Sequence, residues 1–186
     1  MSSQHRANAN IIDRVTTLTA LDRVVFHDDK EGLLGMRVAH FLESPDEKGG
    51  VFLDSSGRAT KVANVDTTGA TGVYLTSEAK KGDAAWGTRG RWCILSGETG
   101  DKSITVGIFD HPGNPGYPTY WMARGYGLFG ANPLADHIYD PKAPIHDFTI
   151  EKGASSIFKY RVAFYDYTVT AEEADRESDA YAAEYK

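Results

Sequence analysis

A polar and aromatic stretch over residues 77–92 (SEAKKGDAAWGTRGRW) holds the densest set of side chains that could do chemistry. Arg89 and Arg91 are two residues apart, so on a strand they would share one face, and we expect Glu78 to meet at least one of them. Two guanidinium groups beside Trp86 could bind a carboxylate or a set of sugar hydroxyls, because arginine offers a planar fork of donors and tryptophan a flat apolar platform. A solvated strand face, with arginine stems packed over aromatic rings, explains the same pattern.

A second stretch, residues 109–132, begins with Asp110-His111 at the end of an expected strand and continues into a loop. Three prolines and two glycines in ten residues exclude a central strand, and we expect the loop to be ordered. A carboxyl–imidazole pair at a strand end can act as acid and base or as metal ligands. Alternatively, His111 caps the turn and the aromatic residues form an outer core. If the loop lines a groove, Trp121 gives the stacking face and Arg124 with His111 gives the polar contacts.

A third stretch, HDDKEGLLGMR at residues 27–37, is a charged turn with carboxylates at Asp28, Asp29 and Glu31 around Lys30. A charged hairpin tip is the simplest interpretation. No C-x-x-C, H-E-x-x-H or calcium-loop spacing is present, and the six histidines are scattered along the chain. The Gly-Tyr-Gly tripeptide lacks the third glycine and the following helix of a nucleotide-binding loop. We therefore expect neither a metal nor a cofactor.

The charge and hydropathy of the chain exclude two classes of partner. Twenty Lys and Arg against 26 Asp and Glu give a net charge of −6, which makes nucleic acid a poor partner. No apolar stretch approaches the roughly 20 residues that a membrane-spanning helix needs. The first ten residues, MSSQHRANAN, lack the apolar region of a secretory signal, so the chain as given is expected to be soluble, and either cytoplasmic or already processed. The one cysteine, Cys93, lies between Trp92 and Ile94, which predicts a buried and unreactive thiol.

Short apolar runs with period-two alternation, separated by glycine and proline, predict an all-β fold. Strands are expected near residues 15–20, 23–27, 33–41, 50–53, 72–77, 89–96, 103–110, 127–132, 148–150 and 156–167. The Gly97–Asp101 segment joins two of them as a hairpin. After Thr170, acidic residues in the first turn predict a C-terminal helix over residues 170–186. The economical architecture is one β-sandwich domain over residues 1–186, with residues 1–12 flexible.

Four segments carry a resemblance to a known family: HDDKEGLLGMRVA (27–39), YLTSEAKKGDAAWGTRGRW (74–92), FDHPGNPGYPTYWMARGYGLFGANP (109–133) and KYRVAFYD (159–166). They are similar to the C-terminal half of a bacterial family of unknown function labelled methane oxygenase PmoA. The resemblance implies a β-rich fold, half of the supersandwich of galactose mutarotases and other carbohydrate-active proteins. The helical subunit of particulate methane monooxygenase is a different kind of protein, because this chain has no membrane-spanning segment.

The resemblance also implies a set of candidate site residues, which match the family motif position by position: Lys30, Glu31, Arg37, Glu78, Lys80, Trp86, Arg89, Trp92, Asp110, His111, Asn114, Tyr117, Trp121 and Arg124. Two departures from the family pattern bear on activity. The histidine-rich motif of the N-terminal half is missing, and Met122 stands where the family usually has histidine. Because methionine cannot transfer protons, loss of a catalytic histidine would leave an inactive protein or a binding relic.

Three functions stay open at this point. The chain could be an enzyme, or half of one, acting on carbohydrate, with Glu78 and His111 as acid and base and the tryptophans and arginines named above binding the sugar. It could be a non-catalytic sugar-binding module. It could instead be a structural or oligomerisation sandwich with no small-molecule substrate, whose aromatic loop is an interface. A carbohydrate-related sandwich ranks first. Because half of a larger sandwich should leave strand edges uncovered, we also predict a homo-oligomer, a dimer in its simplest form.

Overall fold

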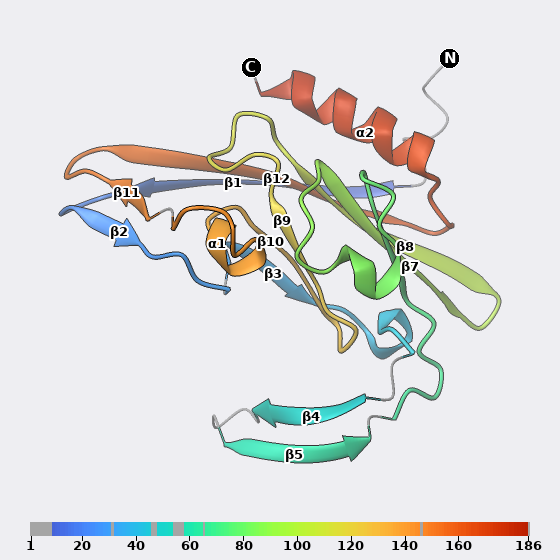
Figure 1. Cartoon of the computed structure of the whole chain (residues 1–186). Helices are drawn as coiled ribbons and strands as arrows, with labels where there is room; N and C mark the ends of the chain where they lie inside the picture. The colour runs from blue at the N-terminus through green and yellow to red at the C-terminus, as the bar shows by residue number, and fades with distance from the viewer. Residues whose placement is uncertain are drawn as a thin grey trace.

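Two antiparallel sheets form the body of the computed structural model (Figure 1), which describes residues 9–30, 32–45, 48–53, 58–64, 66–145 and 147–185. The larger sheet has the strand order β1-β12-β8-β7-β6, and the smaller sheet has the order β3-β10-β9. Their bounds are Ala9–Thr19 for β1, Leu34–Arg37 for β3, Val73–Thr76 for β6, Trp92–Thr99 for β7, Lys102–Asp110 for β8, Tyr120–Ala123 for β9, Leu128–Asn132 for β10 and Ser155–Tyr165 for β12. The predicted all-β sandwich is confirmed.

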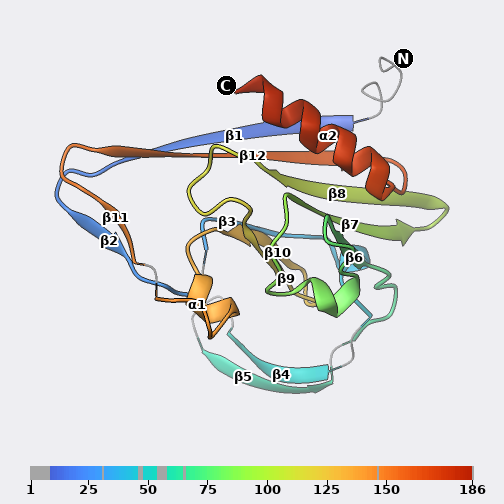
Figure 2. The ribbon, with the colours of Figure 1, turned by 45° about the horizontal axis from the view of Figure 1, so that its top comes forward.

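Shorter elements surround the two sheets (Figure 2). They are the paired strands β2 (Val24–Phe26) and β11 (Phe148–Ile150), the paired strands β4 (Lys48–Leu53) and β5 (Ala59–Asn64), the 3₁₀ turns η2 (His40–Leu42) and η3 (Gly82–Ala85), and the helices α1 (Asp136–Tyr139) and α2 (Ala171–Glu184). The β4–β5 hairpin stands apart from both sheets in the two views. Among the helices that the structure describes, none is long and apolar enough to cross a membrane.

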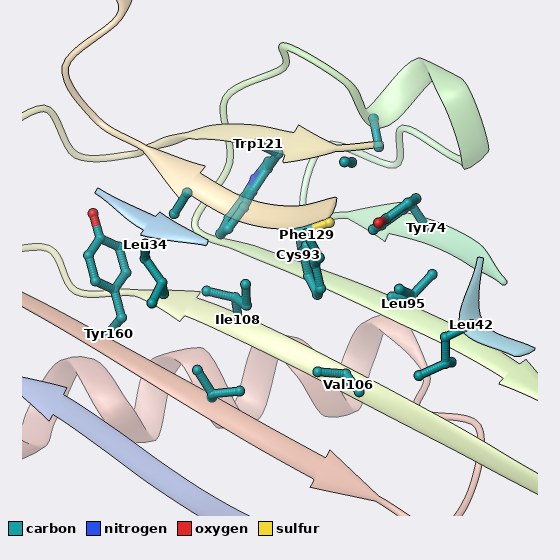
Figure 3. Packing of buried hydrophobic residues seen from close by; sticks show 14 of the residues in the cluster. Leu34, Leu42, Tyr74, Cys93, Leu95, Val106, Ile108, Trp121, Phe129 and Tyr160 are labelled. Atoms are coloured by element: carbon teal, nitrogen blue, oxygen red, sulfur yellow. The ribbon is translucent and has the colours of Figure 1, made fainter. Parts of the chain in front are cut away.

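The main core lies between the two sheets, because alternate residues of each strand point to the same face. Val106 of β8 packs there together with Trp121 and Phe129 of the small sheet (Figure 3). Phe109 of β8, three residues after Val106, faces the opposite side and packs in a second apolar cluster under α2. Cys93 of β7 is completely buried in the main core, and this burial raises the pKa of its thiol. The predicted buried thiol is confirmed.

Helix α2 covers the second face of the large sheet (Figures 1 and 2). Thr170 caps it: the Thr170 hydroxyl accepts a hydrogen bond from the Glu173 amide at 3.3 Å, and the Glu173 carboxylate accepts one from the Thr170 amide at 2.9 Å. This reciprocal pair satisfies two amides that the first turn of a helix leaves without partners. Ala174 and Tyr181 are fully buried against the sheet. The expected C-terminal helix is therefore present, and it buries an apolar stripe.

Arg161 of β12 ties three elements together beneath α2. Its side chain is 4% exposed, and it donates to both carboxylate oxygens of Asp13 on β1 at 2.7 Å. It also donates to Glu177 of α2 at 2.7 Å and to Glu184 near the end of that helix. The hydrogen bonds from Arg161 hold the pKa of Asp13 below its usual range. One buried cation thus joins the edge strand to its neighbour and to the helix above them.

The N-terminal strand begins earlier than the sequence predicts. Residues 9–12, expected to be flexible, are the first residues of β1 and pair with residues 162–165 of β12. The sequence also does not predict β9, which follows the proline-rich loop without a period-two pattern. All four residues of β9 are buried: Trp121 and Ala123 pack in the core, and on the other face Tyr139 of α1 stacks on Tyr120. Alternation disappears from the sequence wherever both faces of a strand are covered.

We expect Arg161→Ala to lower the free energy of unfolding by about 3–5 kcal/mol, because it leaves several carboxylates together without their buried cation. Urea denaturation at neutral pH measures this loss. Acidification should weaken the native protein in the same way: the lowered pKa of Asp13 means that its contribution is complete above the unfolded-state pKa and is lost as pH falls through the folded-state value.

Arg176→Ala is the matched control, since Arg176 lies on the exposed face of α2 and its loss should change stability by about 0.5 kcal/mol or less. Equal stability of the two variants would contradict the structural role assigned to Arg161.

Candidate functional site

The loop that follows β8 is anchored by the buried carboxyl group of Asp110. This side chain is 1% exposed, and it accepts hydrogen bonds from Asn114 Nδ2 at 2.7 Å and from the Thr119 amide at 2.9 Å. The Asn114 amide group in turn pairs with the backbone of Lys159 on β12, donating to its carbonyl at 2.6 Å and accepting from its amide at 2.7 Å. Asp110 and Asn114 therefore fasten the loop to the large sheet, as the expectation of an ordered loop requires. Burial raises the pKa of Asp110 to about 7, despite these hydrogen bonds.

His111 does not act together with Asp110, because successive residues at the end of a strand point to opposite faces. Its ring lies under α2, edge-on to the rings of Tyr181 and Tyr185 at centroid distances of 5.4 and 6.1 Å. Its Nδ1 accepts a hydrogen bond from the Gly113 amide at 3.0 Å, and its Nε2 is buried without a hydrogen-bond partner among the described residues. Burial lowers the pKa of His111, which favours the neutral ring. His111 therefore packs against the two tyrosine rings and caps the turn at Gly113, which is the alternative that the sequence left open.

Glu78 lies on the exposed turn after β6, whereas His111 lies under α2. Its carboxylate accepts a hydrogen bond of 3.5 Å from the Ser77 hydroxyl. Within the part of the chain that the structure describes, no contact joins Glu78 to His111 or to either arginine of the Ser77–Trp92 stretch. The proposed acid and base are not assembled into one site.

The two arginines of this stretch do not share a strand face, so that prediction is wrong. Strand β7 begins only at Trp92; Arg91 lies in a bend before it, and Arg89 forms an isolated β-bridge with Tyr120. Arg89 donates to the carbonyls of Pro118 at 2.8 Å and Gly116 at 2.9 Å, and so holds the proline-rich loop from outside. Arg91 turns the other way and pairs with carboxylates of α2: Asp175 at 2.6 Å and Asp179 at 2.5 Å. Each guanidinium is used to dock a neighbouring segment.

Two of the candidate tryptophans are core residues, which corrects the expectation that Trp121 stacks on a ligand. Trp121 is completely buried between the sheets (Figure 3), because the odd positions of β9 face inward. Trp92 is 1% exposed under α2, where its Nε1 donates to Asp175 at 2.8 Å. Neither indole can present a face to a ligand while the fold is intact. Met122, where the resemblance implies a histidine, is 3% exposed and alternates with Trp121 along β9.

A cluster of aromatic rings and arginines remains, half-buried except for the buried Tyr120, which we call the Trp86 surface: Trp86, Arg89, Tyr120, Arg124 and Tyr139. Trp86 follows η3, Tyr139 ends α1, Tyr120 begins β9, and Arg124 comes directly after β9. The Tyr139 ring meets Trp86 edge-on at 5.3 Å and stacks on Tyr120 at 5.0 Å. The Arg89 guanidinium carbon lies 5.0 Å from the centroid of Tyr120, and that of Arg124 lies 3.1 Å from the centroid of Trp86. Segments far apart in sequence thus build one polar and aromatic surface.

Arg124 differs from the other half-buried arginines because nothing among the described residues accepts a hydrogen bond from its guanidinium group. Its contact is the stack on Trp86, whereas Arg89 and Arg91 bind carbonyls and carboxylates. The Arg124 amide donates to Leu128, which in turn pairs with Arg37 of β3, so the two arginines occupy one row across the small sheet. The contact with Trp86 holds the guanidinium in place and uses none of its N–H donors.

The remaining candidates are not members of this surface. Lys30 is exposed, and its carbonyl accepts a hydrogen bond from the Tyr139 hydroxyl at 3.2 Å, while Glu31 lies outside the described residues. Arg37 donates to the Tyr126 carbonyl at 3.1 Å. Lys80 is on the exposed turn after β6, and Tyr117 is half-buried within the loop. Over the described ranges, no group of three or more His, Cys, Asp or Glu side chains could hold a metal ion.

Sequence reasoning missed Tyr139 and its neighbour Asp136, which is 3.5 Å from Arg89. Tyr139 belongs to a one-turn helix in a segment with no motif and no clear periodicity. The pairing of this segment with the 77–92 stretch follows from the topology alone. The only local hint is Asp136, a carboxylate at the start of a helical turn.

Substitutions of Trp121 and Trp86 should differ in their effect on stability, because Trp121 lies in the core and Trp86 on the surface. We expect Trp121→Ala to lower the free energy of unfolding by about 3–5 kcal/mol, because it removes a fully buried indole from the core. Trp86→Ala should cost about 1 kcal/mol or less, since it loses a half-exposed stack. Urea denaturation of both variants measures the difference, and a cost for Trp86→Ala equal to that for Trp121→Ala would contradict the assignment.

Asp110 should make stability depend on pH near neutrality. Its folded-state pKa of about 7 lies above the ordinary value of 3.8, so the folded state binds the extra proton and the free energy of unfolding should decrease as pH rises from about 4 to 7. Denaturation of the native protein and of Asp110→Asn at about pH 5 and about pH 8 tests this, with the slope reduced in the variant. Parallel slopes would exclude Asp110 as the group responsible.

Comparison with known proteins adds a family and no activity. No curated protein and no solved structure is detectably similar to the chain. A family model does match, over residues 1–179, which is nearly the whole chain and includes every residue of the Trp86 surface. The chain therefore belongs to the family of unknown function DUF6807.

Proposed function

We propose that this protein binds a carbohydrate-like ligand at the Trp86 surface, with Arg124 as the main polar contact. The observation that carries this proposal is the Arg124 guanidinium, stacked 3.1 Å from the centroid of Trp86 and without a hydrogen-bond acceptor among the described residues. A half-buried cation usually spends its donors on carbonyls or carboxylates, as Arg89 and Arg91 do here. A ligand with paired oxygen atoms would complete its hydrogen bonding.

The chemistry of the surrounding side chains suits a sugar. Tyr139 and Trp86 offer apolar ring area, while Arg89 and Asp136 supply charged groups at the border. A ring with hydroxyls on its rim and C–H groups on its faces matches a surface of this composition. The resemblance to the PmoA-labelled family, with its galactose-mutarotase-like fold, supports the same ligand class by analogy.

Binding without turnover is the form of this proposal that the geometry favours. An acid and a base must both reach the reacting atoms, within hydrogen-bonding distance. Asp110 and His111 instead use their polar atoms to hold the loop and its turn, and Glu78 lies apart from both. Met122 offers no proton at the position of the family histidine. An enzymatic role for Glu78 and His111 would require the fold to rearrange.

The test is binding of the full chain to an array of neutral and uronic-acid-containing oligosaccharides, followed by titration of the strongest hit. Arg124→Ala should weaken binding at least tenfold, because the ligand loses a charge-assisted fork. Arg124→Lys should recover little, since lysine keeps the charge without the planar donor pair. Arg176→Ala, the loss of an exposed arginine on α2, is the control and should bind normally.

Circular dichroism of each variant confirms that the fold is retained. An array without any hit would contradict the proposal. Normal binding by Arg124→Ala would place the ligand elsewhere on the molecule.

We also propose that the chain self-associates, as the sequence leads us to expect for an incomplete sandwich. The observation that favours it is the edge strand β1, on which Ile12 is 59% exposed and Val15 is 49% exposed. Strand edges with exposed apolar side chains pair readily with other strands. Self-association and ligand binding use different parts of the fold, so the two functions are compatible.

A further inference from the structure

We propose that two copies of the chain join edge to edge through β1, antiparallel and about a two-fold axis perpendicular to the sheet, with Val15 facing Val15 of the partner subunit. The five-stranded sheets of the two copies would become one continuous sheet. This geometry deepens the self-association proposed above and rests on it.

Strand β1 is the better of the two edges of the large sheet. It has 11 residues without proline or glycine, and β12 is its pairing partner among the described strands, so its outer edge is open there (Figure 1). The opposite edge, β6, has four residues, and a bridge between Leu75 and Lys81 already occupies part of it. A long, regular edge offers a ladder of backbone donors and acceptors to a second strand.

Symmetry limits the ways in which two β1 strands can pair. A two-fold axis perpendicular to the sheet keeps each side chain on its own face. Residues directly opposite each other in an antiparallel pair also share a face. The residue at the axis must therefore oppose the same residue of the other copy, which leaves one choice of register for each central residue.

The charges of β1 distinguish these registers. An axis at Arg14 sets two arginines opposite each other, and an axis at Asp13 sets two aspartates opposite each other; like charges in such pairs are destabilising. An axis at Ile12 pairs only residues 9–15 and sets Asp13 against the apolar Ile11. Each of these three registers carries a fault that the sequence of the strand itself imposes.

An axis at Val15 avoids these faults. Residues 11–19 then pair, Ile12 lies opposite Leu18, and the charged residues 13 and 14 lie opposite threonines 17 and 16. The two most exposed apolar residues of the strand are covered, and Leu18, already packed against the main core, extends that core toward the partner. β1 is thus complementary to itself in this register, which argues for a second copy of the chain as its occupant.

A cysteine at the axis tests the register directly. Opposite residues have Cα atoms about 4.5–5.5 Å apart, which is within disulfide range, so Val15→Cys should give a covalent dimer under mild oxidation. Ile11→Cys is the matched control: two copies of residue 11 would be eight residues apart along the ladder, about 27 Å, and should stay uncrosslinked. The native Cys93 is buried and does not compete.

Light scattering of the full chain at high micromolar concentration gives the second readout. The native chain should be a dimer, and Val15→Lys should raise the dissociation constant at least tenfold by setting two lysines opposite each other. Val73→Lys places the same substitution on the exposed valine of the other edge and should leave the dimer intact.

The outcomes separate the two levels of the proposal. A native monomer would overturn both the self-association and the β1 seam. A native dimer in which Val15→Cys does not crosslink, or Ile11→Cys crosslinks as readily, would overturn the seam and leave the self-association standing.

Discussion

The structure depends on the buried carboxyl group of Asp110, which holds a proline-rich loop onto the end of the large sheet. Through Asn114 and the Thr119 amide, it fixes where the chain leaves β8 and where β9 begins. β9 is an edge strand of the small sheet and pairs with the central strand β10, so this anchor fixes where one edge of the second layer lies. Burying a carboxyl group is costly, as its raised pKa shows, and the hydrogen bonds offset much of that cost.

The conspicuous charged residues of the chain mostly stabilise the fold. Arg161 joins β1, β12 and α2, Arg91 docks α2, and Arg89 holds the loop from outside. Folded proteins usually pair their buried and half-buried cations with hydrogen-bond acceptors. A half-buried cation without an acceptor is therefore a candidate ligand-binding residue. Arg124, supported by Trp86, is such a group, and the candidate site is defined by this contrast.

The exposed residues of β1 are explained by incomplete coverage of the large sheet. Helix α2 and the small sheet cover its central strands, β7, β8 and β12, on both faces. β1 extends beyond this cover, which explains why its isoleucines and valine stay exposed while equivalent residues of β8 are buried. The same geometry that makes the centre of the sheet stable therefore leaves open the edge at which we propose that a second copy pairs.

The sequence by itself determined the all-β class, the capped C-terminal helix and the burial of Cys93, because alternation, capping residues and local apolar context are short-range signals. It also marked Trp86, Arg89 and Arg124 as candidates, by residue type and by family resemblance. It could not show that Trp121 and Trp92 are core residues, or that Arg89 and Arg91 turn apart, because burial depends on which segments pack on each face. Tyr139 joined the surface through a long-range contact with Trp86, and β9 formed only because β10 was there to pair with it. Such contacts arise from the topology, so only the tertiary structure decided them.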